Sequence, residues 1–217
     1  MRETFHGELE ELRESLGEMC TLAATAMRHA TEALLSADLV TAEQVLSADA
    51  ELDKRRDECE ERARQMLALQ APKASDLRLV LSAVYCADRI ERMGDLAEHI
   101  ASTARRLHPA HVVPPELRDT FTKLGEITSA MAETLVAHIT APRLGSFAEL
   151  DETDHQVDDL HAAVLRTITC DSWPHGVPTA TYLALVTRFY ERFADQAVSV
   201  AKRVEFVSTG VTPAHRP

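Results

Sequence analysis

The sequence predicts an all-α protein whose six helices form two tandem, pseudo-symmetric three-helix bundles. The chain of 217 residues has only 7 glycines and 9 prolines and is rich in Ala, Leu, Glu and Arg, which favour helices. Its apolar residues recur at steps of three and four, which is the period of a helix. A pattern of carboxylates in the first half returns in the same order in the second half, as in an internal repeat.

The first three predicted helices occupy residues 5–35, 41–69 and 76–107. Apolar spacing defines the first, through Phe5, Leu9, Leu12, Leu16, Met19, Ala23 and Met27. Ser36-Ala37-Asp38 makes a short break before the second helix, which Pro72 ends. Ser75 is the expected N-cap of the third helix.

A proline-rich hinge separates these helices from the next three. The segment from Pro109 to Pro115 contains three prolines, so it cannot continue a helix. Three more helices are predicted over 116–140, 147–169 and 179–209, separated by Pro142 with Gly145 and by the loop 173–178. The predicted organisation is a first repeat over 1–108, a proline linker over 109–115, a second repeat over 116–210 and a frayed end over 211–217.

The charge of the chain limits its partners. A net charge of −12 argues against nucleic-acid binding, because phosphate contacts need a basic face. It also argues against docking on anionic lipid by charge, so any membrane association would pass through a partner. Cations and basic protein surfaces remain as partners.

The cysteines and the termini indicate a cytoplasmic protein. The four cysteines form no CxxC pair and lie in helical patterns, so they are predicted to be buried free thiols and not a zinc site: Cys20, Cys59, Cys86 and Cys170. The N-terminus lacks the apolar region of a signal peptide. No apolar run approaches the length of a membrane span.

Two Glu-x-x-x-Asp elements, Glu91 with Asp95 and Glu191 with Asp195, carry the functional prediction. Residues four apart share a helix face, where like charges cost about 0.2–0.5 kcal/mol, so a compensating cation or basic partner is expected. An Asp-x-x-x-Asp element precedes each in the helix before it; these elements are Asp49 with Asp53 and Asp154 with Asp158.

A helical wheel places these carboxylates on apolar faces. Asp88, Glu91 and Asp95 fall within roughly 60° of Leu77 and Val84. In the sixth predicted helix the corresponding sector contains Ala180, Ala184, Glu191, Asp195 and Val198. A half-buried carboxylate without a partner must raise its pKa or find a cation.

If the second and third helices are antiparallel, Asp49 and Asp53 face the carboxylates of the third helix. Five carboxylates could then gather in one place. Such a site suits hard cations that prefer oxygen ligands, such as Mg²⁺, Mn²⁺, Ca²⁺ or iron.

Arginines on the same helices offer a competing explanation, because they could neutralise the acids without metal: Arg89, Arg92, Arg188 and Arg192. The two repeats differ at one point, since Asp88 of the first corresponds to Arg188 of the second. The first cluster is therefore expected to bind metal more firmly than the second.

Four motifs link the chain to a known family. They are Phe5-His6-x-x-Leu9-x-x-Leu12, Leu69-Gln70-x-Pro72-x-x-x-Asp76-Leu77-Arg78, Ile90-Glu91-Arg92-Met93-Gly94-Asp95 and Tyr190-Glu191-Arg192-Phe193-Ala194-Asp195-Gln196-Ala197. Together with the repeat they cover nearly the whole chain, which resembles the PhoU family of phosphate-specific transport regulatory proteins. The segment 189–204 is similar to the actinobacterial branch of that family.

The resemblance implies a non-enzymatic negative regulator of phosphate uptake and of the phosphate-starvation response. It implies an adaptor between the ATPase subunit of a phosphate ABC transporter and a membrane sensor histidine kinase. It further implies metal clusters, of Fe, Mn, Mg or Zn, on the Glu/Asp-x-x-x-Asp motifs. Carried over by motif, the ligands are Glu91, Asp95, Glu191 and Asp195, faced by Asp49, Asp53, Asp154 and Asp158. Gln196, where many relatives have His, and Arg188 depart from the pattern at the second site.

Other functions are weighed against this one. No nucleophile–base arrangement and no phosphate-binding Gly-rich loop occurs, so an enzyme is not expected. A carboxylate-bridged di-metal enzyme would use Glu-x-x-His motifs, of which Glu3-x-x-His6 and Glu152-x-x-His155 occur. A purely structural helical module with solvated acids is the third possibility, with His99, one turn after Asp95, the histidine closest to the motif. A homodimer is also expected.

Overall fold

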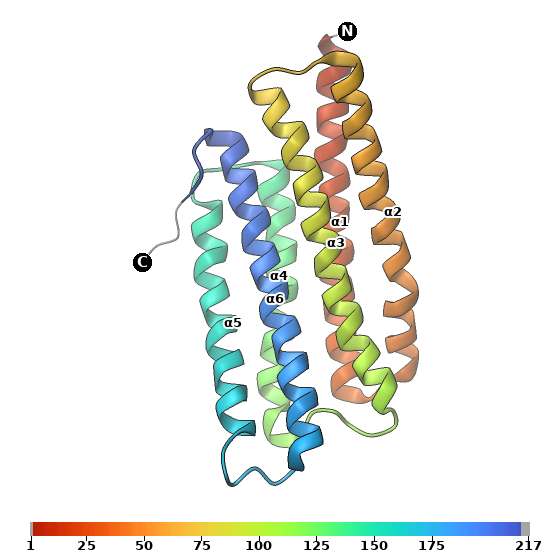
Figure 1. The fold of residues 1–217 in the computed structure, drawn as a ribbon, viewed down its shortest axis with the longest axis vertical. Helices are drawn as coiled ribbons and strands as arrows, with labels where there is room; N and C mark the ends of the chain where they lie inside the picture. Colours follow the sequence, from red (N-terminus) through yellow and green to blue (C-terminus); the bar gives the residue numbers. More distant parts are fainter. Residues whose placement is uncertain (1, 214–217) are drawn as a thin grey trace.

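The fold was analysed in a computed structural model that describes residues 2–213, which contain six long α-helices, one 3₁₀ turn and no strand. The elements are α1 (Arg2–Ser36), α2 (Leu39–Gln70), α3 (Ser75–Leu107), η1 (Pro115–Leu117), α4 (Arg118–Thr140), α5 (Ser146–Ile168) and α6 (Gly176–Thr209). The all-α prediction of two three-helix bundles is confirmed (Figure 1).

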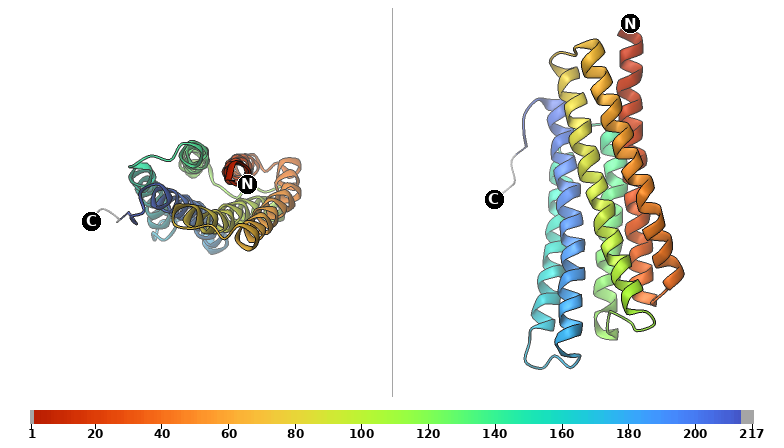
Figure 2. Two further views of the ribbon diagram at one scale, coloured as in Figure 1. Left: turned by 90° about the horizontal axis from the view of Figure 1, so that it is seen from above. Right: turned by 45° about the vertical axis from the view of Figure 1, so that its right-hand side comes forward.

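The two bundles pack side by side along their length. Helices α1, α2 and α3 contact one another in the first bundle, and α4, α5 and α6 do so in the second. The bundles meet where α3 packs against α6 and α1 against α4. Seen end-on, α2, α3, α6 and α5 form a curved row, and α1 with α4 lies on its concave side (Figure 2). All of the predicted carboxylate ligands therefore belong to the four helices of this row.

The starts of α2, α3 and α6 differ from the prediction. Asp38 caps α2 by accepting hydrogen bonds from the backbone N–H groups of Val40 (2.9 Å) and Thr41 (3.3 Å), so α2 begins before residue 41. Ser75 is not an N-cap: it lies inside α3, and its hydroxyl donates to Asp76 Oδ1 (3.3 Å). Pro178 does not delay α6, because a proline in the first turn has no helical hydrogen bond to lose.

Apolar side chains from all six helices form the core. The seven residues whose spacing predicts the first helix are all buried, which confirms the period: Phe5, Leu9, Leu12, Leu16, Met19, Ala23 and Met27. Cys20, Cys59 and Cys86 are buried, but the prediction is wrong for Cys170, which is exposed just after the end of α5. Burial raises the pKa of Cys59 to about 11 and that of Cys86 to about 12, so both stay protonated.

One polar contact ties the two bundles together inside this core. The hydroxyl groups of Thr31 on α1 and Tyr190 on α6 lie 2.9 Å apart and are buried. Gly125 on α4 faces Thr31, and a Cβ at this glycine would lie 2.5 Å from Thr31 Cγ2 and Oγ1. The junction between bundles therefore depends on the absence of a side chain at position 125.

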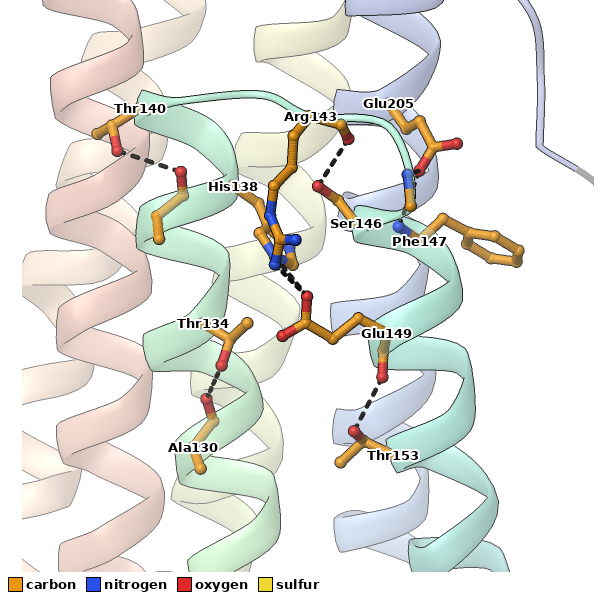
Figure 3. A network of polar contacts seen from close by, with 12 residues as sticks. Ala130, Thr134, His138, Thr140, Arg143, Ser146, Phe147, Glu149, Thr153 and Glu205 are labelled. Carbon is orange, nitrogen blue, oxygen red and sulfur yellow. Dashed lines mark hydrogen bonds and ion pairs between the residues drawn. The ribbon is translucent and has the colours of Figure 1, made fainter.

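A second polar network holds the start of α5 (Figure 3). Glu205 of α6 is buried, and its Oε2 accepts hydrogen bonds from the backbone N–H groups of Gly145 (3.1 Å) and Phe147 (3.0 Å). It acts as the cap that α5 lacks locally, since Gly145 has no side chain to cap with. Close by, Glu149 pairs with Arg143 and lies 3.4 Å from Nε2 of the buried His138.

A Glu205→Ala variant is expected to lose about 2 kcal/mol of unfolding free energy, because two backbone N–H groups near the helix start lose a charged acceptor. Urea unfolding followed by circular dichroism measures the loss. Glu133→Ala, which removes an exposed carboxylate paired with Arg28, is the control and should change stability by less than about 1 kcal/mol. Equal effects of the two substitutions would contradict the capping role.

The predicted frayed end, 211–217, falls partly outside the described residues. Residues 211–213 follow α6 without helical structure, whereas residues 214–217 are not described. Within residues 2–213, no helix is both long and apolar enough to cross a membrane.

Candidate metal centre

The first carboxylate cluster lies where α2 and α3 approach closely. A Cβ at Gly94 of α3 would lie only 2.3 Å from Leu52 Cδ2 and 3.5 Å from Asp49 Oδ1, so glycine permits this approach. The two helices are antiparallel neighbours, as the sequence predicts for facing carboxylates (Figure 1). Asp49 of α2 is thereby placed beside the Glu-x-x-x-Asp element of α3.

Burial and neighbouring acids raise the pKa values of Asp49 on α2 and Glu91 on α3. Burial is the main cause for Asp49, whose pKa rises to about 6, and Asp95 and Asp53 add to the rise. Burial also raises the pKa of Glu91 to about 7, and Asp95 again adds to it, while Arg56 opposes it. Four of the five predicted ligands of the first cluster therefore interact electrostatically.

Asp88, the fifth predicted ligand, does not belong to the cluster. Its side chain is 62% exposed, and its carboxylate lies 4.0 Å from the Nε atom of Arg89. The helical wheel misplaced it, because the sector defined by Leu77 and Val84 is the flank of α3: Leu77 is itself exposed. The buried stripe of α3 instead runs through Val80, Ala83, Ala87, Ile90 and Ala97.

Arginines reach into the first cluster as well as the second. Arg92 pairs with Asp95 at 2.6 Å. Arg56 lies 3.9 Å from Glu91 Oε1 and 4.0 Å from Asp53, although its nearest acid is Asp57 at 3.0 Å. A contact of Arg56 with these acids was not predicted. Its position three residues after Asp53 could have indicated that contact, because residues three apart are neighbours on a helix. The expectation that the first cluster binds metal more firmly than the second rested on Arg188, which lies beside the acids of the second cluster. That expectation loses its support, because arginines lie beside the acids of the first cluster as well.

The second cluster joins α5 to α6. Burial raises the pKa of Asp154 to about 7, and Asp158, Asp195 and Glu191 add to the rise. Burial also raises the pKa of Glu191, with Asp195 adding and Arg188 opposing. Burial is also the main cause of the raised pKa of Asp195. The side chains of Asp195 and Asp158 are nevertheless more open to solvent than those of Asp154 and Glu191.

Two carboxylate oxygens of this cluster have no partner. Asp154 Oδ1 and Glu191 Oε2 are both buried without a hydrogen bond, although Glu191 pairs with Arg188 through its other oxygen. An unpartnered buried carboxylate oxygen is costly, and a cation is the partner that would remove the cost.

The acids of the two clusters have the donor atoms that a metal ion needs, but their positions do not form a ready metal site. All the donors are carboxylate oxygens, as hard cations prefer. Yet among residues 2–213 no three His, Cys, Asp or Glu side chains already converge as a metal site. Three of these acids already have an arginine nearby: Arg56 lies near Glu91, Arg92 pairs with Asp95 and Arg188 pairs with Glu191.

Gln196 and the histidines take other roles. Gln196 is buried and accepts a hydrogen bond from Arg89 Nη1 (3.0 Å), so it connects α6 to α3 across the bundle junction. His99 pairs with Glu98 at 3.1 Å, and its ring centroid lies 5.3 Å from that of Phe189. Glu152 and His155, the inner motif of the di-metal enzyme alternative, are both exposed, so they do not project into the bundle as that alternative requires.

Comparison with known proteins agrees with this architecture. The PhoU domain model matches residues 16–104 and 121–204, which is one match for each three-helix repeat. This chain belongs to the PhoU family. A PhoU homolog 2 of Mycobacterium tuberculosis, named a phosphate-specific transport system accessory protein, is 44% identical over 213 residues, covering 98% of this chain and all of that protein. A homolog 1 from Mycobacterium leprae is also 44% identical, covering 98% of this chain and 96% of its own.

Solved PhoU structures share the fold over the full length. The crystal structure of PhoU from Pseudomonas aeruginosa superposes with a TM-score of 0.87 at 25% identity, covering 95% of this chain and 100% of that one. The phosphate transport system regulatory protein PhoU from Streptococcus pneumoniae gives the same TM-score and identity, with 97% and 99% covered. Three of these four proteins are named as accessory or regulatory proteins.

Proposed function

We propose that this PhoU protein is a non-enzymatic, metal-binding regulator that restrains phosphate uptake and the phosphate-starvation response when phosphate is plentiful. It acts as an adaptor between the ATPase subunit of a phosphate ABC transporter and a membrane sensor histidine kinase. The names of its relatives support the link to phosphate transport. The carboxylate clusters support the proposal that the protein binds metal.

The observation that carries the proposal is the repeated pairing of carboxylates across neighbouring helices. Asp49 and Glu91 in one bundle, and Asp154 and Glu191 in the other, all have pKa values raised first by burial and then by neighbouring acids. A bound Fe, Mn, Mg or Zn ion would supply the missing positive charge. The four side chains would then be held ionised and in one arrangement, which would stiffen the α2–α3 and α5–α6 pairs for partner binding.

An adaptor role agrees with the rest of the molecule. The chain carries a net charge of −12, which suits basic partner surfaces, and its long helices offer wide faces. Homodimer formation stays a prediction: elution volume should decrease as protein concentration rises, and a mass that stays monomeric at high concentration would exclude it.

The function is tested in a strain that lacks the protein. With ample phosphate, deletion should raise expression from a phosphate-starvation promoter, and the wild-type gene should restore repression. A gene carrying Glu91→Gln, Asp95→Asn, Asp154→Asn and Glu191→Gln should restore it poorly at equal protein level. A deletion that leaves the promoter silent would overturn the regulatory role. Full repression by the four-site variant would show that repression does not depend on metal binding by these acids.

The protein without metal should become more stable as pH falls from about 8 to about 5. In the folded state Glu91 and Asp154 have pKa values of about 7 and Asp49 one of about 6, against about 4 when unfolded, so the folded state binds more protons in this range. Burial lowers the pKa of His138, which opposes the gain below about pH 6.5.

Protons and metal ions should therefore compete. The rise in melting temperature caused by Mn²⁺ should be larger at pH 8 than at pH 6, because the ligands must be deprotonated. Melting curves in chelator and in Mn²⁺ at both pH values measure this, with Glu152→Gln as the exposed control on α5. A metal effect that is equal at both pH values would contradict binding by these acids.

A further inference from the structure

A cationic groove lies beside the α3–α6 contact, near the carboxyl end of α6. It has a volume of about 370 Å³, and Lys202, Arg203, Phe206 and Ser199 of α6 line it together with Tyr85 of α3 and Thr212. Helices α3 and α6 run side by side here, at the junction between the two bundles (Figure 1). The groove is therefore built from both repeats.

Aromatic rings hold the positive side chains in place. The guanidinium carbon of Arg203 lies 4.2 Å from the ring centroid of Tyr85 and 5.8 Å from that of Phe206. Arg89 lies 4.9 Å from the same tyrosine ring, and Arg78 lies 5.9 Å from Phe206. A guanidinium stacked on a ring leaves its N–H edge free to bind a planar or tetrahedral anion.

Three of the four cations near the groove have no carboxylate partner among residues 2–213, and the exception is Arg89, which lies 4.0 Å from Asp88. Over the described range 2–213, no carboxylate lies within ion-pair distance of Arg78, Lys202 or Arg203. The Nε atoms of Arg78 and Arg89 are buried without a hydrogen-bond partner. Lys202 and Arg203 line the same hollow without a carboxylate partner in the described residues, so they focus positive potential there.

We propose that this groove binds a small anion that carries phosphoryl groups, either free phosphate or diphosphate or the phosphate chain of a nucleotide. The fork of a guanidinium group matches phosphoryl oxygens in pairs, and Lys202 adds a third charge. The hydroxyl groups of Ser199 and Thr212 can donate further hydrogen bonds. The volume lies within the range of small-molecule sites.

The anion would lie where the two halves of the protein meet, since Tyr85 belongs to α3 and Lys202 and Arg203 belong to α6. Its binding is independent of the metal centre and of the proposed function. The competing explanation is that the cations only stabilise the carboxyl end of α6, where a Cβ at Gly210 would lie 2.7 Å from Arg78 Nη1.

The test is titration calorimetry of the full chain in chelator with inorganic phosphate, diphosphate, ADP and, as a comparison anion, sulfate. We expect diphosphate to bind with a Kd below about 1 mM and Arg203→Gln to weaken it at least about tenfold. Arg28→Gln, which removes the same charge from an exposed pair with Glu133, should leave binding unchanged. Tighter binding of ADP than of diphosphate would assign the groove to nucleotides; the reverse would assign it to free phosphates.

Two results would overturn the proposal. One is that none of the phosphoryl anions binds the wild-type chain, or that sulfate binds equally well. The other is that Arg203→Gln and Arg28→Gln bind alike. Should Arg203→Gln not fold, Lys202→Gln and Arg203→Lys provide the same comparison, since the first removes a charge and the second keeps the charge without the fork.

Discussion

A Gly125→Ala variant is expected to lose about 2–3 kcal/mol of unfolding free energy. The added Cβ would lie 2.5 Å from Thr31 Cγ2 and Oγ1 and 2.8 Å from Thr31 Cβ, so rotation of the threonine cannot relieve the overlap. Overpacking costs about 1–3 kcal/mol or more, and the buried contact between Thr31 and Tyr190 would be disturbed as well. The gain of about 1 kcal/mol from replacing a helical glycine by alanine is smaller.

Gly17→Ala is the matched control, because its Cβ would lie at an ordinary 3.7 Å from Val136 Cγ1. This variant should gain up to about 1 kcal/mol. Thr31→Ala should recover part of the Gly125→Ala loss in a double-mutant cycle, since it removes two of the three close atoms. Denaturant unfolding of the parent and these four variants measures the stability changes, and equal stability of the two glycine variants would show that the bundle junction is not tightly packed.

Replacing Asp154 by Asn and Glu191 by Gln is expected to act in opposite directions on the protein without and with metal. Without metal at pH 8, the double variant should be more stable by about 1–2 kcal/mol, because two buried, partly unpartnered charges disappear. With Mn²⁺, the rise in melting temperature that depends on the second cluster should be lost. Arg188, which would lose its partner Glu191, is more than half exposed and can be solvated.

The control for this variant is Glu152→Gln with Asp88→Asn, which removes two exposed carboxylates. Both double variants remove the same net charge, so a difference in stability between them is caused by the cluster and not by the total charge. Destabilisation of the Asp154→Asn, Glu191→Gln protein in chelator would mean that these acids are satisfied in the folded state, contrary to the unpartnered oxygens.

The fold was predictable because its signals are periodic and local. The spacing from Phe5 to Met27 and the prolines between 109 and 115 determine where helices run and stop, and the repeated carboxylates reveal the two halves. The exact starts of α2 and α6 were less predictable, since capping by Asp38 and a first-turn proline compete with the weaker signals used to place them. The cap of α5 could not be predicted, because Glu205 lies on another helix.

The site was predictable as motifs but not as geometry. The approach of Asp49 to Asp95, of Asp53 to Glu91 and of Asp154 to Glu191 follows from antiparallel neighbours. The outward turn of Asp88 does not follow, because a wheel drawn from Leu77 cannot distinguish a buried stripe from a flank. The contact of Arg56 with Glu91 depends on how two helices align, so the position of Arg56 three residues after Asp53 indicates only its contact within α2.

The measurement that tests the account most directly is the metal content of the purified protein after dialysis against Fe, Mn, Mg and Zn salts. It should be made on the parent, on a Glu91→Gln, Asp95→Asn variant, on the Asp154→Asn, Glu191→Gln variant and on their combination. We expect bound metal in the parent, a partial loss of metal in each cluster variant and no metal in the combined variant. A parent without metal, or a combined variant that keeps it, would contradict the account and leave the two acidic clusters to arginines or to basic partners.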